Sequence, residues 1–493
     1  MSRRDDPDSA AEPPVSDTPA WMPAWMASML VHVIVLLALA LIVDRRPHRQ
    51  VRWTIVSPAI HEPATPDDAG ADLPGQADLW GPPAAIEIVA SPDVSTADLA
   101  GRPTFDDLEA ALPPVAEVTA GPETAVLGDP LAAAAAGGHF GGRAQPGRLA
   151  AARGGGIDTE AAVDGGLRWL AAHQLADGGW SFDLTACPAC RGACSHSGAS
   201  LAEDRCAATA LALLPFLGRG YTHRTGAYQR HVEGGMAFLA TLAARGEGRV
   251  FGGRGTMYSQ GLAGIALAEC YGMTRDPRLA APAQAALDFI MRAQDPVGGG
   301  WRYAPGEPGD TSALGWQIMA LKSGDMAGLQ IAPTTIAKAA AFLDTVQADA
   351  SGATYGYTDA SEPTAGRSAV GILCRMYMGW GRDRPGLGEG VAHLAALGPT
   401  DDLYYDYYAT QIMHHVGGEP WVGWNTAMKR LLLESQSRSG HEAGSWREGV
   451  AGGIGGVKAG RLYCTSLATM ILEVYYRHLP IYRPESVADD FRE

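Results

Sequence analysis

The chain has 493 residues, of which 46% are hydrophobic, and it carries a formal net charge of -16 at pH 7. This length allows two or three domains with at least one large apolar core, which excludes a chain that is disordered throughout. Residues 53–142 hold fourteen Asp or Glu and one basic residue, so fourteen minus one, or thirteen, of the net negative charges lie there. The remainder is close to neutral and lacks the basic footprint of a nucleic-acid-binding protein.

The first element in chain order is a stretch without charged side chains, residues 18–43. Its densest apolar part, Trp25 to Val43, would span roughly 29 Å as a helix at about 1.5 Å per residue, close to the thickness of a hydrocarbon core. We therefore predict a polar tail over residues 1–20 and a transmembrane helix over residues 21–43, which makes the chain a single-pass membrane protein. A cleaved signal peptide is the alternative, but the leader ahead of the apolar run is long and acidic.

A segment rich in Pro, Ala, Gly and acidic residues follows, over residues 44–155. It cannot bury enough apolar surface to offset the entropy of ordering, so we predict a flexible, disordered linker. Four arginines between residues 45 and 52 favour a cytoplasmic C-terminal part by the positive-inside rule. In contrast, the Ser28-x-x-x-His32 pair with its long Pro-rich tether resembles the anchor of TonB-type energy transducers. That resemblance implies an extracytoplasmic C-terminal domain, and we favour this side of the membrane.

From residue 157 onward a related segment returns along the chain. In its clearest copy, Gly166 to Trp180, a helical stretch leads through a Gly pair to a Trp. Apolar helical segments lie between the copies, and neighbouring copies are 38 to 69 residues apart. Such repeats indicate an array in which no unit buries its apolar face alone, and six helix pairs are enough to close a ring. The other copies are Ala286 to Trp301, Ala339 to Tyr357 and Ala427 to Trp446, with weaker ones at Gly234 to Gly246 and Gly390 to Gly398.

The clearest copy, GLRWLAAHQLADGGW, has Gln174 and Trp180 spaced as in the QW motif of squalene and oxidosqualene cyclases. It resembles that motif without its leading basic residue, and the helix pairing resembles the prenyltransferase and squalene oxidase repeat. The resemblance implies an all-α fold, an α/α toroid of about six helix pairs over residues 156–483 whose inner helices surround a cavity. Residues 484–493 would form a C-terminal tail. Because toroids of this kind host unrelated activities, the resemblance predicts the fold and leaves the function open.

The stretch EPGDTSALGWQ, Glu307 to Gln317, is comparable with a motif of squalene-hopene cyclases. These enzymes carry Asp-x-Asp-Asp-Thr-Ala, whose middle Asp protonates the alkene. On that motif Glu307 replaces the first Asp, Asp310 matches the last, and Gly309 stands at the position of the proton donor. Protonation of an alkene needs a strong, positioned acid, which Gly does not supply. We therefore interpret Asp310 as the N-cap of a helix, and catalysis by Asp310 or Glu307 is the alternative.

Two further patterns are candidates for chemistry. The stretch DDLYYDYY contains Asp401, Asp402 and Asp406, carboxylates of the kind that hold a diphosphate through Mg²⁺. We interpret it as a solvated, aromatic-rich turn between helices, with Asp402 kept as a catalytic candidate. His414 in YYATQIMHHVGG is an acid-base candidate, although a core histidine is the more common role. The Asp-x-Cys pair of the protein prenyltransferase zinc site has no counterpart, since no Asp stands two positions before Cys464.

A cysteine-rich stretch, CPACRGACSH, interrupts the first repeat. It supplies Cys187, Cys190, Cys194 and His196, and Cys206 follows as an alternative ligand. These residue types and spacings suit a tetrahedral structural zinc, which would staple a loop that has no core of its own. Disulfides are the alternative if the domain is extracytoplasmic, and unlinked thiols are the third interpretation. A site with four protein ligands leaves no open position for catalysis.

Two functions remain open at this stage. The first is a membrane-anchored binding or scaffold module that contacts the membrane through its N-terminal helix and takes a lipid, polysaccharide or protein ligand in the toroid cavity. The second is an enzyme that acts on an isoprenoid or polymer substrate in the same cavity. The missing cyclase proton donor favours the first.

Overall fold

The structure describes most of the C-terminal two thirds of the chain. The computed structural model describes residues 103–105, 138–194, 201–253, 255–447 and 453–482. The polar tail of residues 1–20, the predicted transmembrane helix of residues 21–43, most of the predicted linker and the C-terminal tail of residues 484–493 lie outside these ranges. Within them, the structure has no helix with both the length and the apolar character that a membrane span needs.

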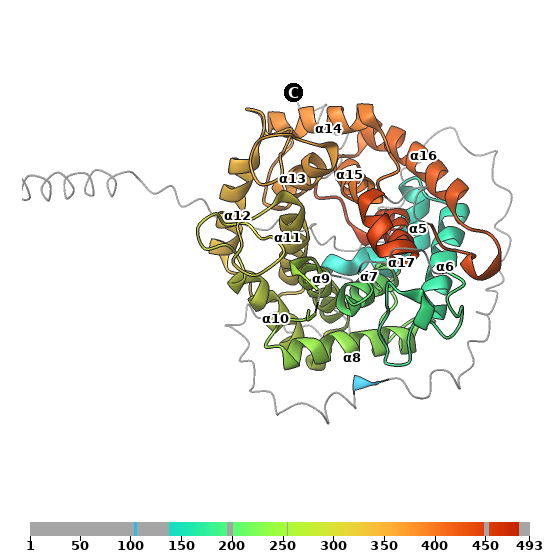
Figure 1. Cartoon of the computed structure of the whole chain (residues 1–493). Helices are drawn as coiled ribbons and strands as arrows, with labels where there is room; N and C mark the ends of the chain where they lie inside the picture. The colour runs from blue at the N-terminus through green and yellow to red at the C-terminus, as the bar shows by residue number, and fades with distance from the viewer. Residues whose placement is uncertain (1–102, 106–137, 195–200, 254, 448–452, 483–493) are drawn as a thin grey trace, which may run out of the picture. The chain divides into compact units, whose positions relative to one another are not determined.

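Six pairs of helices form a closed ring (Figure 1). The inner helices contact one another in chain order from α7 to α17, and α17 in turn contacts α7. Each outer helix precedes its inner partner in the chain, so the described residues form the all-α toroid that the repeats predict. The outer helices are α6 (Ile157–Ala172), α8 (Gln229–Arg245), α10 (Pro277–Arg292), α12 (Pro333–Val346), α14 (Pro385–Leu397) and α16 (Gly418–Ser435), and the inner helices are α7 (Arg205–Gly218), α9 (Met257–Thr274), α11 (Thr311–Met326), α13 (Ala365–Tyr377), α15 (Leu403–Val416) and α17 (Gly453–Leu472).

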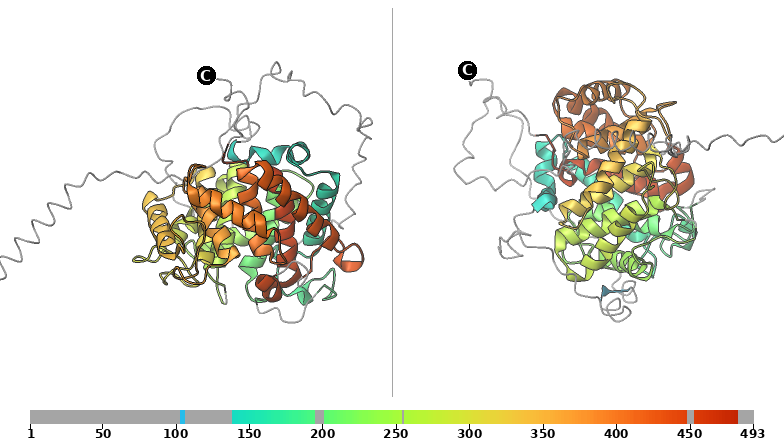
Figure 2. Two further views of the ribbon diagram at one scale, coloured as in Figure 1. Left: turned by 90° about the horizontal axis from the view of Figure 1, so that it is seen from above. Right: turned by 90° about the vertical axis from the view of Figure 1, so that its left-hand side faces the viewer.

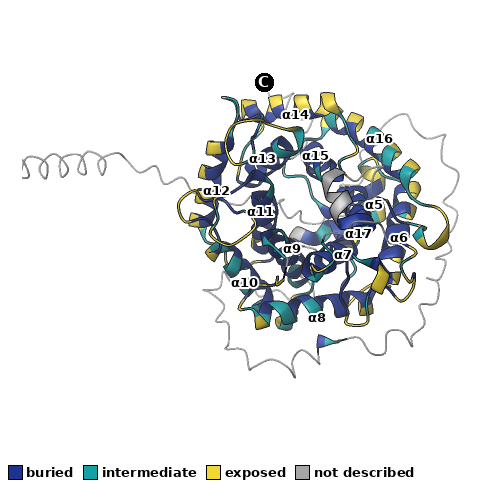
Figure 3. Cartoon of the chain, viewed as in Figure 1, coloured by how far each residue is buried: buried dark blue, intermediate teal, exposed yellow. Residues whose placement is uncertain are grey.

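Buried residues make up nearly all of the described inner helices, whereas the outer helices mix buried and exposed residues (Figure 3). In the inner helix α11, all residues from 313 to 324 are buried. The outer helix α10 instead buries Leu279, Ala283, Leu287 and Ile290, which follow one another at intervals of three or four residues and leave the opposite face to solvent. The inner helices are therefore buried on nearly all sides, whereas the outer ones are amphipathic.

The glutamines of the repeated motif tie neighbouring helix pairs together. Gln174 Nε2 donates a hydrogen bond of 2.9 Å to the carbonyl oxygen of His231 in the first turn of α8. Gln294 makes the equivalent bond to the start of α12. Gln436 donates a bond of 2.8 Å to the carbonyl oxygen of Ala162 in α6, so the last clear copy of the motif joins the end of the ring to its beginning.

The turn that follows each of these glutamines needs a glycine. Gly178 has a φ of +83°, and a Cβ at this position would lie 2.5 Å from the carbonyl oxygen of Gly234 in α8. Only glycine fits both the backbone conformation and the close approach. Two residues later, the buried indole of Trp180 donates a hydrogen bond of 2.7 Å to the carbonyl oxygen of Leu170. The Gly and Trp of the motif therefore fix the turn that follows α6 and hold it against that helix.

Five of the six inner helices begin with a side-chain cap at the same end of the ring. Each cap accepts a hydrogen bond from a free backbone N–H of the first turn, which would otherwise have no partner. The last inner helix, α17, has a non-helical residue, Gly460, within it. The capping residues are Asp204 of α7, Thr256 of α9, Asp310 of α11, Thr364 of α13 and Asp402 of α15.

Residues 138–152 fall in the range predicted as a linker but are helical and lie against one end of the ring (Figure 2). They form η2 (Gly138–Ala144) and α5 (Pro146–Ala152), and both contact the last helix, α18 (Val474–Arg477). Phe140 packs against Met326 and Ala327, and Arg143 reaches into the ring. Two well-placed side chains and tertiary contacts therefore order a segment whose Gly-rich composition predicts disorder.

Candidate functional site

Asp310, which the sequence predicts as an N-cap, lies at the end of the ring where the inner helices begin. It is fully buried, and its Oδ1 accepts a hydrogen bond of 2.7 Å from the backbone N–H of Ala313. Tyr357 donates its hydroxyl to Oδ2 at 3.1 Å, and Arg302 Nε lies 3.9 Å from the same oxygen. Burial raises the pKa of Asp310 above its ordinary value, although these partners oppose the shift. Asp310 therefore has the geometry of an N-cap, with one oxygen shared with a tyrosine.

The neighbours of Asp310 do not supply the missing proton donor. Glu307 Oε2 accepts hydrogen bonds from the backbone N–H groups of Tyr303 and Ala304, at 3.2 and 2.9 Å, and so closes its own loop. Gly309 lies against Gly300, and a Cβ at Gly309 would lie 2.5 Å from its Cα atom. The backbone thus leaves no room for an acidic side chain at the position where cyclases carry one.

The interpretation of DDLYYDYY as a solvated turn is wrong, because residues 403–408 form the first turns of the inner helix α15. Asp402 caps that helix through the backbone N–H of Tyr404 at 3.0 Å, and burial raises its pKa. Asp406 is buried, accepts a hydrogen bond from the backbone N–H of Thr400, and has its pKa raised by burial to about 8. Among the described residues, the group of side chains suited to a metal ion does not include these aspartates.

His414 is a buried residue of α15. Its ring packs edge-on against Trp421 at a centroid distance of 5.1 Å, and neither ring nitrogen has a hydrogen-bond partner. Burial lowers the pKa of His414 to about 3, so the imidazole is neutral at physiological pH. No other acid or base reaches its ring nitrogens within the described residues, which leaves it without a partner for proton transfer.

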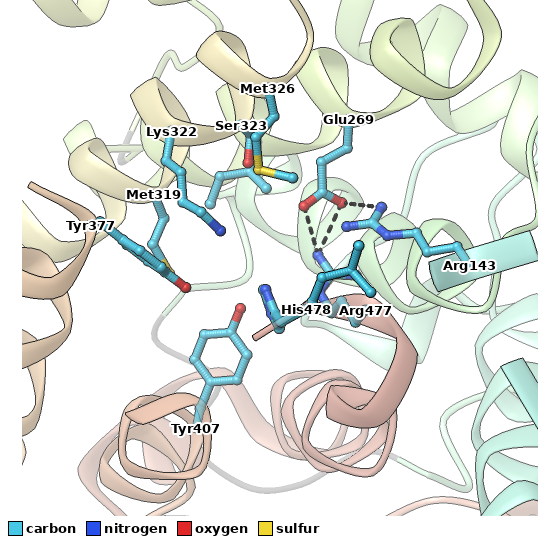
Figure 4. A pocket seen from close by; sticks show the side chains of 12 residues that line it. Arg143, Glu269, Met319, Lys322, Ser323, Met326, Tyr377, Tyr407, Arg477 and His478 are labelled. Carbon is cyan, nitrogen blue, oxygen red and sulfur yellow. Dashed lines mark hydrogen bonds and ion pairs between the residues drawn. The ribbon is translucent and has the colours of Figure 1, made fainter. Parts of the chain in front are cut away.

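A pocket that sequence reasoning missed lies at the opposite end, near the C-terminal ends of the inner helices (Figure 4). We call it the cationic pocket. Its cavity volume is small, about 20 Å³, and the pocket is partly open to solvent. Its polar lining comes from elements spread over the whole described chain: Arg143 of η2, Glu269 of α9, Lys322 of α11, Tyr377 of α13, Tyr407 of α15 and Arg477 of α18.

Two guanidinium groups share one carboxylate in the cationic pocket. Arg143 Nη1 and Arg477 Nη2 lie 2.8 and 3.0 Å from Glu269 Oε2. Burial alone would raise the pKa of Glu269, but attraction to both arginines lowers it below its ordinary value, so the carboxylate is ionised. The lining therefore contains three basic side chains, with Lys322 as the third, and one acidic side chain.

Lys322 and His478 add polar atoms that point into the same space (Figure 4). Lys322 Nζ lies 4.1 Å from the centroid of the Tyr377 ring, a cation–π geometry. Burial lowers the pKa of Lys322 to about 7, which lies within the physiological range. His478 Nε2 is shielded from solvent and has no hydrogen-bond partner. A set of convergent donors with excess positive charge is suited to a carboxylate or phosphate group.

The cysteine-rich stretch lies in the loop between α6 and α7, which includes η3 (Leu184–Ala186). The structure brings Cys190 and Cys194 together with His173 at the end of α6, and their ligand atoms lie within 4.8 Å of one another. This group could hold a metal ion. The predicted ligand His196 lies outside the described residues. Cys206 is not in the group, because it belongs to α7 and its thiol faces the carbonyl oxygen of Ser259 at 3.7 Å.

His173 is the residue of this group that sequence reasoning missed. It stands fourteen positions before Cys187, inside the first copy of the repeated motif. The motif accounts for the neighbouring Gln174, so nothing in the sequence marks His173 as a metal ligand. The seven cysteines of the chain are all described, and none is linked to another in this structure. The pairing of a helix-end histidine with a distant loop becomes visible only in three dimensions.

Comparisons with known proteins address the fold. No family model matches the sequence, and no curated protein matches it either. An inactive variant of an α-1,6-mannanase from Salegentibacter sp. HEL1_6, in complex with α-1,6-mannotriose, is similar with a TM-score of 0.44 and 10% identity, over 64% of this chain and 99% of that chain. A variant of a type II terpene cyclase from Scytonema, in complex with geranylgeranyl dihydroxybenzoate, is similar with a TM-score of 0.43 and 13% identity, over 65% of this chain and 97% of that chain.

At TM-scores below 0.5 and such low identity, neither similarity decides the fold or the activity of this chain. The predicted α/α toroid is confirmed by the closed ring of helix pairs in the structure itself. The function of this chain must therefore be sought in its own side chains.

Proposed function

We propose that the chain is a membrane-anchored toroid that binds a ligand through a carboxylate or phosphate group in the cationic pocket. One observation supports this most strongly: three basic side chains and one acidic side chain line the same buried space. The acidic group belongs to a lipid, polysaccharide or protein ligand, the classes that the toroid cavity suggests from the sequence. The pocket takes the charged group, and the rest of the ligand extends through the open mouth.

The proposal follows from the cost of isolated charge in a protein interior. Glu269 is already shared by Arg143 and Arg477, so it cannot fully compensate a third cation. An uncompensated buried charge costs several kcal/mol after relaxation. Lys322 avoids that cost by losing its proton near pH 7, and a bound anion would offset it directly. The side chains of the pocket are therefore arranged so that an anion stabilises them.

Binding of simple anions to the full-length protein in detergent tests this proposal. Sulfate and succinate should raise the unfolding midpoint, since a ligand at 100 times its Kd adds about 2.7 kcal/mol to the free energy of unfolding. Glucose at equal concentration should have no such effect. Arg143→Gln should reduce the shift, whereas the matched control Arg148→Gln on the exposed face of α5 should not. Equal shifts for anions and glucose, or for the two variants, would contradict an anion site in this pocket.

An enzyme acting on an isoprenoid or polymer substrate is the second candidate, and Asp310 is the observation that favours it. Its Oδ2 is bonded to Tyr357, and burial raises its pKa, so it is the acid best placed at the other end of the ring. The other oxygen of this carboxylate, Oδ1, caps α11, however, and Gly309 occupies the donor position of the cyclases. Incubation of the wild-type protein with squalene separates the two candidates, because the binding proposal predicts no cyclised product.

We also propose that the cysteine-rich loop holds a structural zinc ion, as its residue types suggest. This ion takes no part in binding the ligand.

A further inference from the structure

We propose that His173 is the fourth ligand of this metal site and completes a tetrahedral centre with Cys187, Cys190 and Cys194. The inference rests on the proposed zinc ion and adds what that ion does: it fastens the loop between α6 and α7 to the end of α6. It replaces the ligand set expected from the sequence, because neither His196 nor Cys206 is needed.

The geometry of His173 is that of a metal ligand. Its Nδ1 lies 2.6 Å from the carbonyl oxygen of Trp169 and donates to it, so the proton is on Nδ1 and the lone pair of Nε2 is free. Nε2 is buried and has no hydrogen-bond partner. Metal-binding histidines commonly donate their second nitrogen to a backbone carbonyl, which fixes the tautomer and the ring orientation. The Trp169 ring stacks on the imidazole at 3.9 Å and holds it further in place.

The unpartnered Nε2 is the observation that points to a ligand. A buried polar atom without a partner costs about 1–3 kcal/mol, and native proteins rarely leave one in place without a role. The two thiols of Cys190 and Cys194 lie within 4.8 Å of a ring nitrogen of His173 and of each other. Ligand atoms in a tetrahedral zinc site are about 3.4–3.8 Å apart, as follows from bond lengths of about 2.3 Å to sulfur and 2.0 Å to nitrogen. Small side-chain rotations upon metal binding would close that difference.

Cys187 supplies the remaining ligand. Its thiol lies 3.7 Å from the carbonyl oxygen of Ala172, the residue next to His173. The backbone N–H groups of Ala189 and Cys190 both donate toward the Cys187 sulfur, so the Cys-Pro-Ala-Cys turn folds around it. The Cys187 thiol lies outside the three ligand atoms that are within 4.8 Å of one another, so the turn brings it toward them when the metal binds.

The loop geometry between the second and third cysteines brings the ligands to one point. Arg191 and Gly192 have positive φ values of 48° and 84°, and the backbone N–H of Ala193 donates to the carbonyl oxygen of Cys190 at 2.8 Å. This tight reversal returns the chain so that Cys194 faces Cys190. Three sulfurs from the loop and one nitrogen from α6 give a closed site, whose role is structural because no position remains for a substrate.

The metal ion should stabilise the cysteine-rich loop and not the whole ring. Trp180, Phe182 and Leu184 pack the first part of the loop into the core, but residues 187–194 contribute no large apolar side chain. The position of that stretch therefore depends on the four ligands, while the ring is held by its helices. Removal of the metal should expose the loop to protease and leave the helical content of the ring unchanged. The metal centre and the cationic pocket lie on different elements of the ring, and binding at the pocket should persist without zinc.

X-ray absorption at the zinc edge on the full-length wild-type protein tests the ligand set directly. We expect one zinc per chain with three sulfurs at about 2.3 Å and one nitrogen at about 2.0 Å. The absence of zinc would refute the zinc proposal itself. Zinc with four sulfurs would show that Cys206 and not His173 completes the site, and zinc with two sulfurs and two nitrogens would show a different set.

Variants identify which histidine supplies the nitrogen. His173→Ala should lower zinc affinity at least tenfold, and His173→Cys should restore binding with a fourth sulfur in the absorption spectrum. The matched control His393→Ala, on the exposed face of α14, and His196→Ala should each keep one zinc per chain. Full zinc affinity in His173→Ala, failure of His173→Cys to bind, or loss of zinc only in His196→Ala would overturn the inference while leaving the zinc ion itself in place.

Discussion

Replacement of Lys322 by Met tests the electrostatics of the cationic pocket. Burial lowers the pKa of Lys322 from 10.5 to about 7, an effect that Arg143, Arg477 and their partner Glu269 modulate. The proton affinity of the Lys322 amine therefore falls by about three and a half powers of ten, which corresponds to roughly 5 kcal/mol at about 1.4 kcal/mol per power of ten. This is the order of the free-energy cost of keeping the amine buried in the ligand-free protein, and Lys322→Met removes it.

The sign of the pH dependence follows from where the proton is bound. The unfolded chain binds a proton on Lys322 below pH 10.5, whereas the folded protein binds it only below about pH 7. The cost to stability is therefore absent above pH 10.5, grows as the pH falls towards 7, and is constant below that. Lys322→Met should raise the free energy of unfolding at pH 7 by up to a few kcal/mol, with little gain at pH 10.5.

The same proton on Lys322 should also make anion affinity depend on pH. A bound anion keeps Lys322 protonated, so anion affinity should fall as the pH rises above 7, by about tenfold between pH 6 and pH 8. Other groups around the amine keep one charge state in this window: Glu269 is ionised, and burial lowers the pKa values of His415 and His478 well below their ordinary value, so both are neutral. Asp325, the remaining charged neighbour, is exposed on α11.

Calorimetric titration of sulfate, whose own charge is constant from pH 6 to pH 9, measures this effect. Wild type should lose affinity with rising pH, Lys322→Met should bind weakly at every pH, and the exposed control Lys338→Met on α12 should follow wild type. Affinity that is independent of pH in wild type, or a pH dependence that survives in Lys322→Met, would refute the reasoning.

The remaining predictions concern the ring and its anchor. Asp310→Ala should lower the free energy of unfolding by about 1 kcal/mol through loss of the cap, and Asp310→Asn should largely restore it; equal melting curves would count against the cap. Gly178→Ala should destabilise the ring by more than about 1 kcal/mol, because its positive φ and the approach to Gly234 exclude a Cβ; a neutral effect in thermal unfolding would be unexpected. Carbonate should leave the protein in the membrane through residues 21–43, and protease should cut within residues 53–137 without unfolding the ring; release by carbonate or a resistant linker would contradict the predicted organisation.

The ring could be predicted because its signals are local and repeated. Each copy of the motif carries its own Gln, Gly and Trp, and Gln174 and Trp180 make the bonds that the chain reversal requires. The cap at Asp310 was predictable for the same reason, since an Asp before a Thr-Ser pair and an apolar run satisfies the free N–H groups of a first turn. The start of α15 is harder to predict, because an Asp in a turn and an Asp that caps a helix stand in similar sequence, and Asp402 is a cap.

The two sites could not be predicted because their residues are distant in the sequence. Arg143 and Arg477 meet at Glu269 across more than three hundred residues, and no local pattern marks any of them. In the sequence Lys322 looks like an ordinary helix lysine, and only the folded ring shows that it is buried. In the same way, the cysteines of the loop indicate a metal site, but His173 belongs to another element and lacks ligand spacing to them.

Anomalous diffraction from crystals soaked in selenate is the measurement that tests the central claim most directly. Selenate has the charge and shape of sulfate, and its selenium can be located without bias. The account predicts an anomalous peak in the cationic pocket within hydrogen-bond reach of Lys322 and of the arginine pair, Arg143 and Arg477, and a much weaker peak there in Lys322→Met. Selenate bound elsewhere on the ring, with this pocket empty in the wild-type protein, would contradict it.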